Sequence, residues 1–182
     1  MGGDDKVKYK EITIESKEDV RLPNEVFDIF GKMHVNRMNG EWTYEFEMFD
    51  EVETMLFPDE NYDIEQIENN GFAIGAYHND KCIGIAIYEF CWNKYIYLSD
   101  LKVNQEFRKK GVAAELIKKG QKVADAKGYK GIYTVGQDNN LAACKFYLKQ
   151  GFEIGGLNTR VYGHTKQQGK SDIYFYLENT DE

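Results

Sequence analysis

"DLKVNQEFRKKGVAAELIKKG" (residues 100–120) begins with the pattern of a strand and ends with that of a helix. Between the two lies Arg108-Lys109-Lys110-Gly111-Val112-Ala113, where three cations are followed by residues no larger than Val. A helix that begins near Gly111 leaves its first N–H groups without partners inside the helix, and its dipole makes that end electropositive. Small side chains at Gly111, Ala113 and Ala114 leave the backbone accessible. This corner therefore has the properties of a phosphate or pyrophosphate site.

The corner matches neither of two well-known phosphate motifs. It contains no GxxxxGK[ST] and no GxGxxG. Taken as RxxGxA alone it is a weak signal, because such strings arise by chance. A helix start with a solvated basic turn explains the same residues, so the corner by itself leaves both readings open.

A second segment, QDNNLAACKFYLKQGF (residues 137–152), has the pattern of a helix with one specialised face. Asn140 and Tyr147 are seven residues apart, which places them on the same helix face about 10.5 Å from each other. The small Ala143 lies between them on that face. An amide, a gap and a phenol in a row suit an extended chain with amide groups, such as a pantetheine arm. Taken alone, however, Phe146 and Tyr147 are more often core aromatics.

The rest of the chain predicts a mixed α/β domain with an antiparallel front half and a β-α-β unit behind it. Hydrophobic periodicity predicts the order strand, helices, a meander of three strands, helix, strand, helix and two strands. The expected strands are residues 8–15, 71–78, 82–92, 95–103, 131–135, 159–164 and 172–177. The expected helices are residues 24–32 with Asn24 as N-cap, one or two within the acidic stretch 41–68, 111–128 and 139–150.

Composition predicts one globular domain over residues 1–182. Hydrophobic residues make up 42% and aromatic residues 14% of the chain, and no linker-like or repeated stretch divides it. The first ten residues lack the apolar run of a signal peptide, and no stretch approaches membrane-spanning length. Three cysteines without CxxC spacing are typical of reduced thiols, so we expect a cytoplasmic protein. His34, His78 and His164 are scattered, and no metal is expected.

The charge is unevenly distributed along the chain. The net charge of −8 argues against a nucleic-acid binder. From Glu41 to Glu68 there are eleven acidic residues and no Lys or Arg, whereas Lys102 to Lys130 carries nine basic and three acidic residues. One acidic and one basic region would suit a cationic and an anionic ligand. On charge alone, two solvated helix faces are the simpler explanation.

Together, the two segments resemble the signature segments of the GNAT superfamily of acetyl-CoA-dependent N-acetyltransferases. The resemblance is closer still to the streptothricin (nourseothricin) acetyltransferases, and it rests on FDIFGK, NGEWTYEFE, WNKYIYLSDLKV and QDNNLAACKFYLKQGFEIGG. It implies a mostly antiparallel central sheet flanked by helices, with splayed central strands. It also implies a substrate side in residues 1–70 and an acetyl-CoA-binding core in residues 71–182.

The resemblance further implies roles for particular residues. Backbone groups of Leu101 and Val103 would bond the acetyl carbonyl and pantetheine, Asn140 would touch the pantetheine arm, and Tyr147 would protonate the departing thiolate. Ala113 stands where many superfamily members have a second glycine, and the superfamily tolerates Ala there. The pyrophosphate would be held at the basic corner, by Arg108, Lys109, Lys110, Gly111, Val112, Ala113 and Ala114.

Transfer of an acetyl group to an amine also needs a neutral nucleophile, and an alkylamine with a pKa near 10.4 is almost fully protonated at neutral pH. Asp100 is the best candidate for a base or a substrate anchor. Strand alternation is expected to place it on the same face as Ile96 and Leu98, where a carboxylate needs a partner or a function. A strand end that turns Asp100 to solvent is the alternative. Glu89, on the preceding strand, is a second carboxylate and the weaker candidate for this role.

The expected function is acetylation of the β-lysine amine of streptothricin, which would give antibiotic resistance. Trp42 and Tyr44 are expected to join Glu89 and Asp100 in binding this cationic substrate. The alternatives are the same chemistry on a polyamine, an aminoglycoside or a protein lysine, or an acyl-CoA-binding module without turnover. Neither nucleic acid nor membrane is expected as a partner, and a homodimer is plausible by family analogy.

Overall fold

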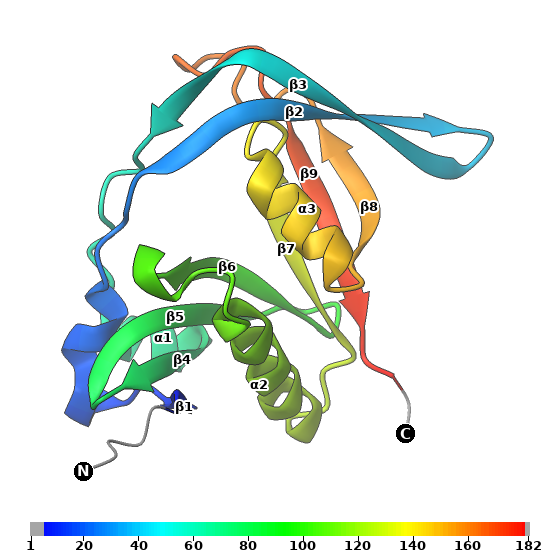
Figure 1. The fold of residues 1–182 in the computed structure, drawn as a ribbon. Helices are drawn as coiled ribbons and strands as arrows, with labels where there is room; N and C mark the ends of the chain where they lie inside the picture. Colours follow the sequence, from blue (N-terminus) through cyan, green and yellow to red (C-terminus); the bar gives the residue numbers. More distant parts are fainter. Residues whose placement is uncertain (1–5, 181–182) are drawn as a thin grey trace. The chain divides into compact units, whose positions relative to one another are not determined.

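The computed structural model describes residues 6–180, which form two compact units (Figure 1). Unit 1 takes residues 6–25, 57–132 and 179–180, and unit 2 takes Val26–Leu56 and Tyr133–Glu178. Each unit is thus assembled from segments that are distant in the sequence. The organisation as a single domain stays a prediction.

Unit 1 is built on an antiparallel sheet with the strand order β1 (Lys8–Glu11), β4 (Gly71–His78), β5 (Lys81–Phe90) and β6 (Tyr95–Val103). Asn79 and Asp80 form a two-residue turn with positive φ of 49° and 60°, which matches the twist of the hairpin β4–β5. The helical elements of this unit are η1 (Ile14–Arg21), α1 (Ile64–Asn70), η2 (Gln105–Phe107) and α2 (Val112–Ala126).

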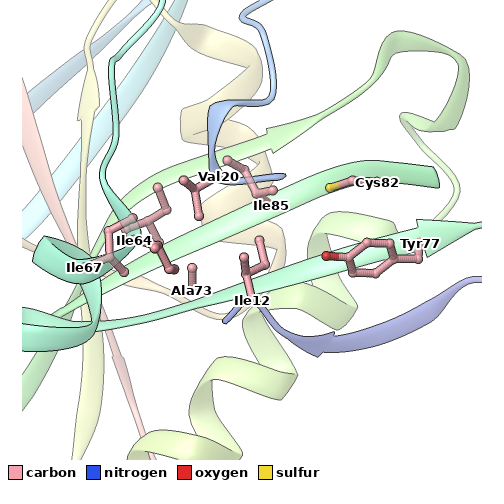
Figure 2. Close-up of a cluster of buried hydrophobic side chains, with 9 residues drawn as sticks. Ile12, Val20, Ile64, Ile67, Ala73, Tyr77, Cys82 and Ile85 are labelled. Atoms are coloured by element: carbon pink, nitrogen blue, oxygen red, sulfur yellow. The ribbon is translucent and has the colours of Figure 1, made fainter. Parts of the chain in front are cut away.

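One face of this sheet is covered by η1 and α1. Ile64 and Ile67 of α1 pack with Ile85 and Ile87 of β5, and Val20 of η1 joins the same buried cluster (Figure 2). Successive residues of a strand point to opposite faces. Ile85 and Ile87 of β5 therefore face α1, and the intervening Ala86 and the following Tyr88 face away from it.

The opposite face is covered by α2. The Tyr88 hydroxyl donates a hydrogen bond of 3.0 Å to the Leu116 carbonyl of α2, and Tyr88 is fully buried. Helix α2 and strand β5 approach each other closely at this point, so a Cβ atom added to Gly120 would overlap the Tyr88 ring. A glycine is thus required in the middle of α2.

Unit 2 combines a long two-stranded ribbon, β2 (Phe27–Met38) and β3 (Glu41–Met55), with α3 (Leu141–Lys149) and three strands. These strands are β7 (Gly131–Gln137), which begins in unit 1, β8 (Glu153–Asn158) and β9 (Asp172–Glu178), in the order β7-β9-β8. The ribbon lies against α3, where Leu141 approaches Gly31 so closely that a Cβ atom would meet it at 2.6 Å.

The helices expected at residues 24–32 and within residues 41–55 are wrong. Both segments are strands, and only the α1 part of the acidic stretch is helical. Burial in β2 alternates, with Ile29, Gly31, Met33 and Val35 buried, which is the period of a strand. The decisive signal is Asn39-Gly40, whose positive φ values of 53° and 86° form the two-residue turn that closes the ribbon.

The strand expected at residues 159–164 is also wrong, because these residues form turns and β8 lies earlier. The Asn158 side chain accepts a hydrogen bond from the Arg160 backbone N–H, and this local bond ends the strand. Asn24 caps no helix; its backbone N–H bonds Asp59 instead. The other expected elements are confirmed within a few residues, as is the mostly antiparallel α/β fold.

Candidate active site

The path of β6 changes at Ser99, beside Asp100. Leu98 pairs with Tyr88, yet Asp100 pairs with Ile87, so β6 advances two residues while β5 advances one. This is a β-bulge, which inserts an extra residue and re-aims the side chains that follow. The Ser99 hydroxyl bonds the Ile87 carbonyl at 3.3 Å across the bulge. Asp100 therefore shares the α1-side face with Ile87, and its expected position on the face of Ile96 and Leu98 is wrong.

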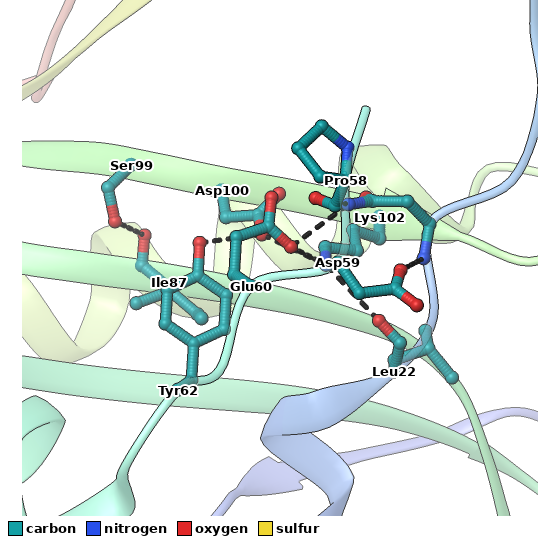
Figure 3. Close-up of polar contacts among 10 residues, drawn as sticks. Leu22, Pro58, Asp59, Glu60, Tyr62, Ile87, Ser99, Asp100 and Lys102 are labelled. Atoms are coloured by element: carbon teal, nitrogen blue, oxygen red, sulfur yellow. Dashed lines mark hydrogen bonds and ion pairs between the residues drawn. The ribbon is translucent and has the colours of Figure 1, made fainter. Parts of the chain in front are cut away.

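Asp100 belongs to a connected polar network on that face (Figure 3). The Tyr62 hydroxyl donates a hydrogen bond of 2.9 Å to Oδ2 of Asp100, and Nζ of Lys102 lies 3.3 Å from the same oxygen. Lys102 also contacts Oε2 of Glu60 at 2.6 Å. The side chains of Lys102 and Asp100 are only 9% and 15% exposed. The network thus brings two carboxylates, one ammonium and one phenol together in a largely dry setting.

Burial and charge shift the protonation of these groups. Burial raises the pKa of Asp100, although Lys102 and the Tyr62 hydrogen bond pull it down. Burial likewise raises the pKa of the Tyr62 phenol, and the neighbouring charge of Asp100 adds to this. Burial also works to raise the pKa of Glu60, but hydrogen bonds from Lys102 and Asn24 outweigh it and leave that pKa lowered. Asp100 is therefore the carboxylate of this network that most readily accepts a proton.

The chain segment that supplies Glu60 and Tyr62 is itself anchored. Asn24 donates to Glu60 and to the Pro58 carbonyl, both at 3.0 Å. Lys102 donates to the Leu22 carbonyl at 3.1 Å. Glu60, Tyr62 and Lys102 were missed by the sequence analysis. Lys102 could have been found, because residues two apart on a strand share a face and Lys102 stands two positions from Asp100.

A pocket of about 410 Å³ lies beside this network, between α1 and the end of β5. Its lining comes from residues 61–70 and 87–90, and Tyr62 is part of it. Glu89 lines the same pocket and is exposed. The structure thus places Glu89 and Asp100 on neighbouring strands of unit 1, with Tyr62 in contact with Asp100.

The basic corner keeps its backbone open. Gly111 adopts a left-handed conformation (φ 82°) as the N-cap of the fifteen-residue α2, and a Cβ atom there would meet nothing within 4 Å. Lys109 also has a positive φ of 59°. Gly111 has no side chain that could bond the first backbone N–H groups of the helix. The N–H groups of Val112 and Ala113 belong to the electropositive end of α2. These features fit an anionic phosphate group.

The three cations of the corner differ in their surroundings. Arg108 bonds inward, with Nε 2.9 Å from the Val103 carbonyl and Nη2 3.4 Å from Glu25. Lys110 lies over the Phe107 ring at 5.4 Å, and Lys109 and Lys110 are exposed. Arg108 therefore ties the corner to the end of β6, while the two lysines are the exposed charges.

Asn140 and Tyr147 lie in unit 2. Asn140 is the N-cap of α3 rather than a residue of its first turn, and its Oδ1 accepts from the Ala143 N–H at 3.3 Å. Tyr147 is 8% exposed and packs against the rings of Phe146, Phe152 and Phe175. Tyr147 therefore contributes to the aromatic core of unit 2, and a catalytic role for it stays a prediction.

Trp42 and Tyr44 lie on β3 of the ribbon. Arg37 stacks over the Trp42 ring at 5.4 Å, and Tyr44 is 45% exposed beside Phe46. The predicted site residues thus fall into two groups: Glu89, Asp100, Leu101, Val103 and the corner in unit 1, and Trp42, Tyr44, Asn140 and Tyr147 in unit 2.

The described part of the chain has neither a metal-binding cluster nor a membrane-spanning helix. Within residues 6–180 no group of three His, Cys, Asp or Glu side chains is arranged to hold a metal ion. Over the same residues no helix combines the length and apolar character needed to cross a membrane.

The sequence and fold define the class of protein. The model of the acetyltransferase (GNAT) family matches residues 38–152, which include β3 of the ribbon, the network, the corner and α3. The chain belongs to this family and is an acetyltransferase.

Several similar proteins are named as streptothricin or nourseothricin acetyltransferases. Streptothricin acetyltransferase A of Bacillus subtilis (strain 168) is 33% identical over 162 residues, which cover 88% of this chain and 94% of that protein. A Bacillus anthracis str. Ames protein assigned as a streptothricin acetyltransferase was solved in complex with acetyl coenzyme A. It superposes with a TM-score of 0.85 at 26% identity, over 96% of this chain and all of that one. Nourseothricin acetyltransferase shows the same fold, with a TM-score of 0.79 at 21% identity over 94% and 98% of the two chains.

Proposed function

We propose that this protein transfers the acetyl group of acetyl-CoA to the β-lysine amine of streptothricin and so gives resistance to that antibiotic. The observation that carries the proposal is similarity to a streptothricin acetyltransferase over nearly the whole of both chains. Two enzymes that use the same acceptor should be similar also outside the residues that the whole family shares. The similarity to this relative does extend beyond residues 38–152. The buried Asp100 network supports it, since the acceptor is cationic.

On the acceptor side, we assign Asp100 as the group that receives the amine. A protonated amine cannot attack a thioester, because its lone pair is occupied. A catalytic base works best when its pKa lies near the operating pH. The pKa of Asp100 is raised, and it is therefore closer to neutral pH than the pKa of an ordinary Asp. Tyr62 and Lys102 hold its carboxylate in position. The amine proton would pass to Asp100 or to solvent as the new C–N bond forms.

On the donor side, acetyl-CoA supplies an acetyl group activated as a thioester. The backbone N–H groups from Lys109 to Ala114 are proposed to bind its pyrophosphate, and those of Leu101 and Val103 its acetyl carbonyl and pantetheine. Asn140 is proposed to bind the pantetheine arm. Tyr147 is proposed to donate the proton that the leaving thiolate needs when the C–S bond breaks. The amine therefore gains one acetyl group and loses one proton, and CoA leaves as a thiol.

A cytoplasmic location would agree with this donor, and Cys82 and Cys144 are free thiols. A homodimer stays a prediction. The test of the function is release of CoA thiol with a panel of amines, together with the mass of each product. Streptothricin should gain one acetyl group (about 42 Da) and be used far better than spermidine, aminoglycosides or peptide lysines. If another amine is acetylated and streptothricin is not, the proposed substrate is wrong.

A further inference from the structure

The pocket between α1 and β5 is not used by the proposed chemistry. Its ten lining residues include two carboxylates, Asp63 and Glu89, three amides, and no Lys or Arg. Ile67 and Ile87 contribute apolar surface. A pocket of about 410 Å³ with this lining is within the size range of small-molecule sites. Its charge and hydrogen-bonding groups suit a cationic ligand group with several N–H or O–H donors.

The pocket adjoins the network but is separate from Asp100. Tyr62 lines the pocket, while its hydroxyl is directed to Asp100, which is not part of the lining. Lys102 lies 5.6 Å from the centre of the Tyr62 ring and is held by Glu60 and Asp100. The ammonium of Lys102 is thus already matched by two carboxylates and does not neutralise the carboxylates of the pocket lining.

Glu89 is the lining carboxylate best suited to a ligand. Asp63 is committed to the helix, because its Oδ1 caps α1 by accepting from the Glu65 N–H at 3.0 Å. Glu89 is exposed at the end of β5, on the same face as Ile87 and Asp100. A cation bound beside Glu89 would therefore be one strand away from an amine held at Asp100.

We infer that this pocket binds a second cationic group of the acceptor, distinct from the amine that is acetylated, and that Glu89 is its charge partner. The inference rests on the proposed function for the identity of the reacting site at Asp100. With this pocket, the protein would select an acceptor that carries two positive charges at the separation of Asp100 and Glu89. A monoamine would meet only one of the two carboxylates.

The kinetic test compares Glu89→Gln with Glu11→Gln. Glu11 is exposed on β1, is not part of the lining, and loses the same charge when substituted. For Glu89→Gln we expect KM for streptothricin to rise about tenfold, as for loss of one charge-assisted hydrogen bond, with kcat changed less than twofold. KM for acetyl-CoA should not change. Glu11→Gln should leave all three constants as they were. An unchanged KM in Glu89→Gln, or an equal rise in both variants, would overturn the inference.

A binding test separates this inference from the proposed substrate. Agmatine carries an ammonium and a guanidinium group on a four-carbon chain, and n-butylamine carries the ammonium alone. In NMR titrations we expect agmatine to bind more tightly than n-butylamine, with shifts at residues 61–70 and 87–90, and Glu89→Gln to remove the difference. Equal binding of the two probes to the parent protein would overturn the inference. If streptothricin is not acetylated but agmatine shows this preference, the proposed substrate fails and the cation pocket stands.

Discussion

Tyr62 donates its hydroxyl hydrogen bond to Asp100 across 38 positions of sequence, at 2.9 Å. The contact depends on the bulge at Ser99, since without the extra residue Asp100 would point to the face covered by α2. A one-residue irregularity thus turns a carboxylate from an apolar core toward a polar network. The consequence is an Asp100 that is largely buried and hydrogen-bonded, beside a pocket.

The first prediction is that Asp100→Asn lowers kcat/KM for the acceptor by roughly 10²- to 10⁴-fold, the usual range for a general base. The amide cannot accept the proton, but it keeps the shape and can still bond Tyr62. Steady-state kinetics with saturating acetyl-CoA measure the effect. A loss confined to KM would identify Asp100 as a substrate anchor rather than a base.

The fold should survive this substitution. In the parent, the pKa of Asp100 is raised in the folded state, so its contribution to stability is present below the unfolded pKa and is lost as pH rises through the folded pKa. Asn has no such dependence. At pH 7 we therefore expect the variant to unfold at a temperature no lower than the parent, whereas a large drop would mean that the activity loss reflects misfolding.

The second prediction concerns Tyr62→Phe, which removes a hydrogen bond that favours the charged form of Asp100. The pKa of Asp100 should rise further above its ordinary value. The acidic limb of the kcat/KM profile, where Asp100 becomes protonated, should then shift to higher pH, while the profile at alkaline pH changes little. Tyr9→Phe, on β1, is the matched control and should leave the limb in place. An identical limb in parent and Tyr62→Phe would show that Asp100 is not the group that titrates.

The sequence carried the local features of this site but not its long-range partners. Arg108 to Ala114 could be read as a helix start, because glycine and small residues act through the backbone they belong to. The Tyr62 contact could not be predicted from the local sequence, since it depends on a bulge in β6. The only trace of this bulge in the sequence is the polar Ser99 between Leu98 and Asp100. The general lesson is that strand alternation fails wherever a bulge intervenes.

The misassigned ribbon has a different cause. Its apolar residues can be fitted to a helical stripe as well as to a strand, and the many Glu residues of 41–55 favour helix by intrinsic propensity. Asn39-Gly40 is a strong hairpin signal that overrides both, and it forms the turn that joins β2 to β3. How two units arise from interleaved segments has no local signal at all.

The third prediction tests the corner with two glycines of one helix. Gly111 and Gly128 flank α2, both have positive φ (82° and 80°), and neither has an atom within 4 Å of an added Cβ. Backbone strain from Asp should therefore be similar at the two positions. We expect Gly111→Asp to weaken acetyl-CoA binding at least about tenfold in calorimetric titration, since about 1.4 kcal/mol of charge repulsion is enough. Gly128→Asp should bind like the parent. Equal losses in both variants would remove the corner as the phosphate site.

The fourth prediction is that Tyr147→Phe keeps acetyl-CoA binding and lowers kcat by roughly 10²- to 10⁴-fold, as expected for loss of a general acid. Phe preserves the ring that packs against Phe152 and Phe175, so the core of unit 2 should be intact. Single-turnover kinetics separate the chemical step from product release. A variant with full kcat would leave Tyr147 as a core aromatic only.

The fifth prediction concerns salt. If the acceptor is held by Asp100 and Glu89, part of its affinity is electrostatic, and the screening length falls from about 10 Å at 0.1 M to about 3 Å at 1 M ionic strength. KM for streptothricin should then rise with NaCl more than kcat falls. The rise in KM should be smaller in Glu89→Gln, because this variant keeps the charge of Asp100 but has lost that of Glu89. Kinetics at several NaCl concentrations provide the measurement, with potassium acetate as a check for chloride effects. Parallel salt slopes in parent and variant would mean that Glu89 does not face the acceptor, and that its selection depends on shape and hydrogen bonds instead.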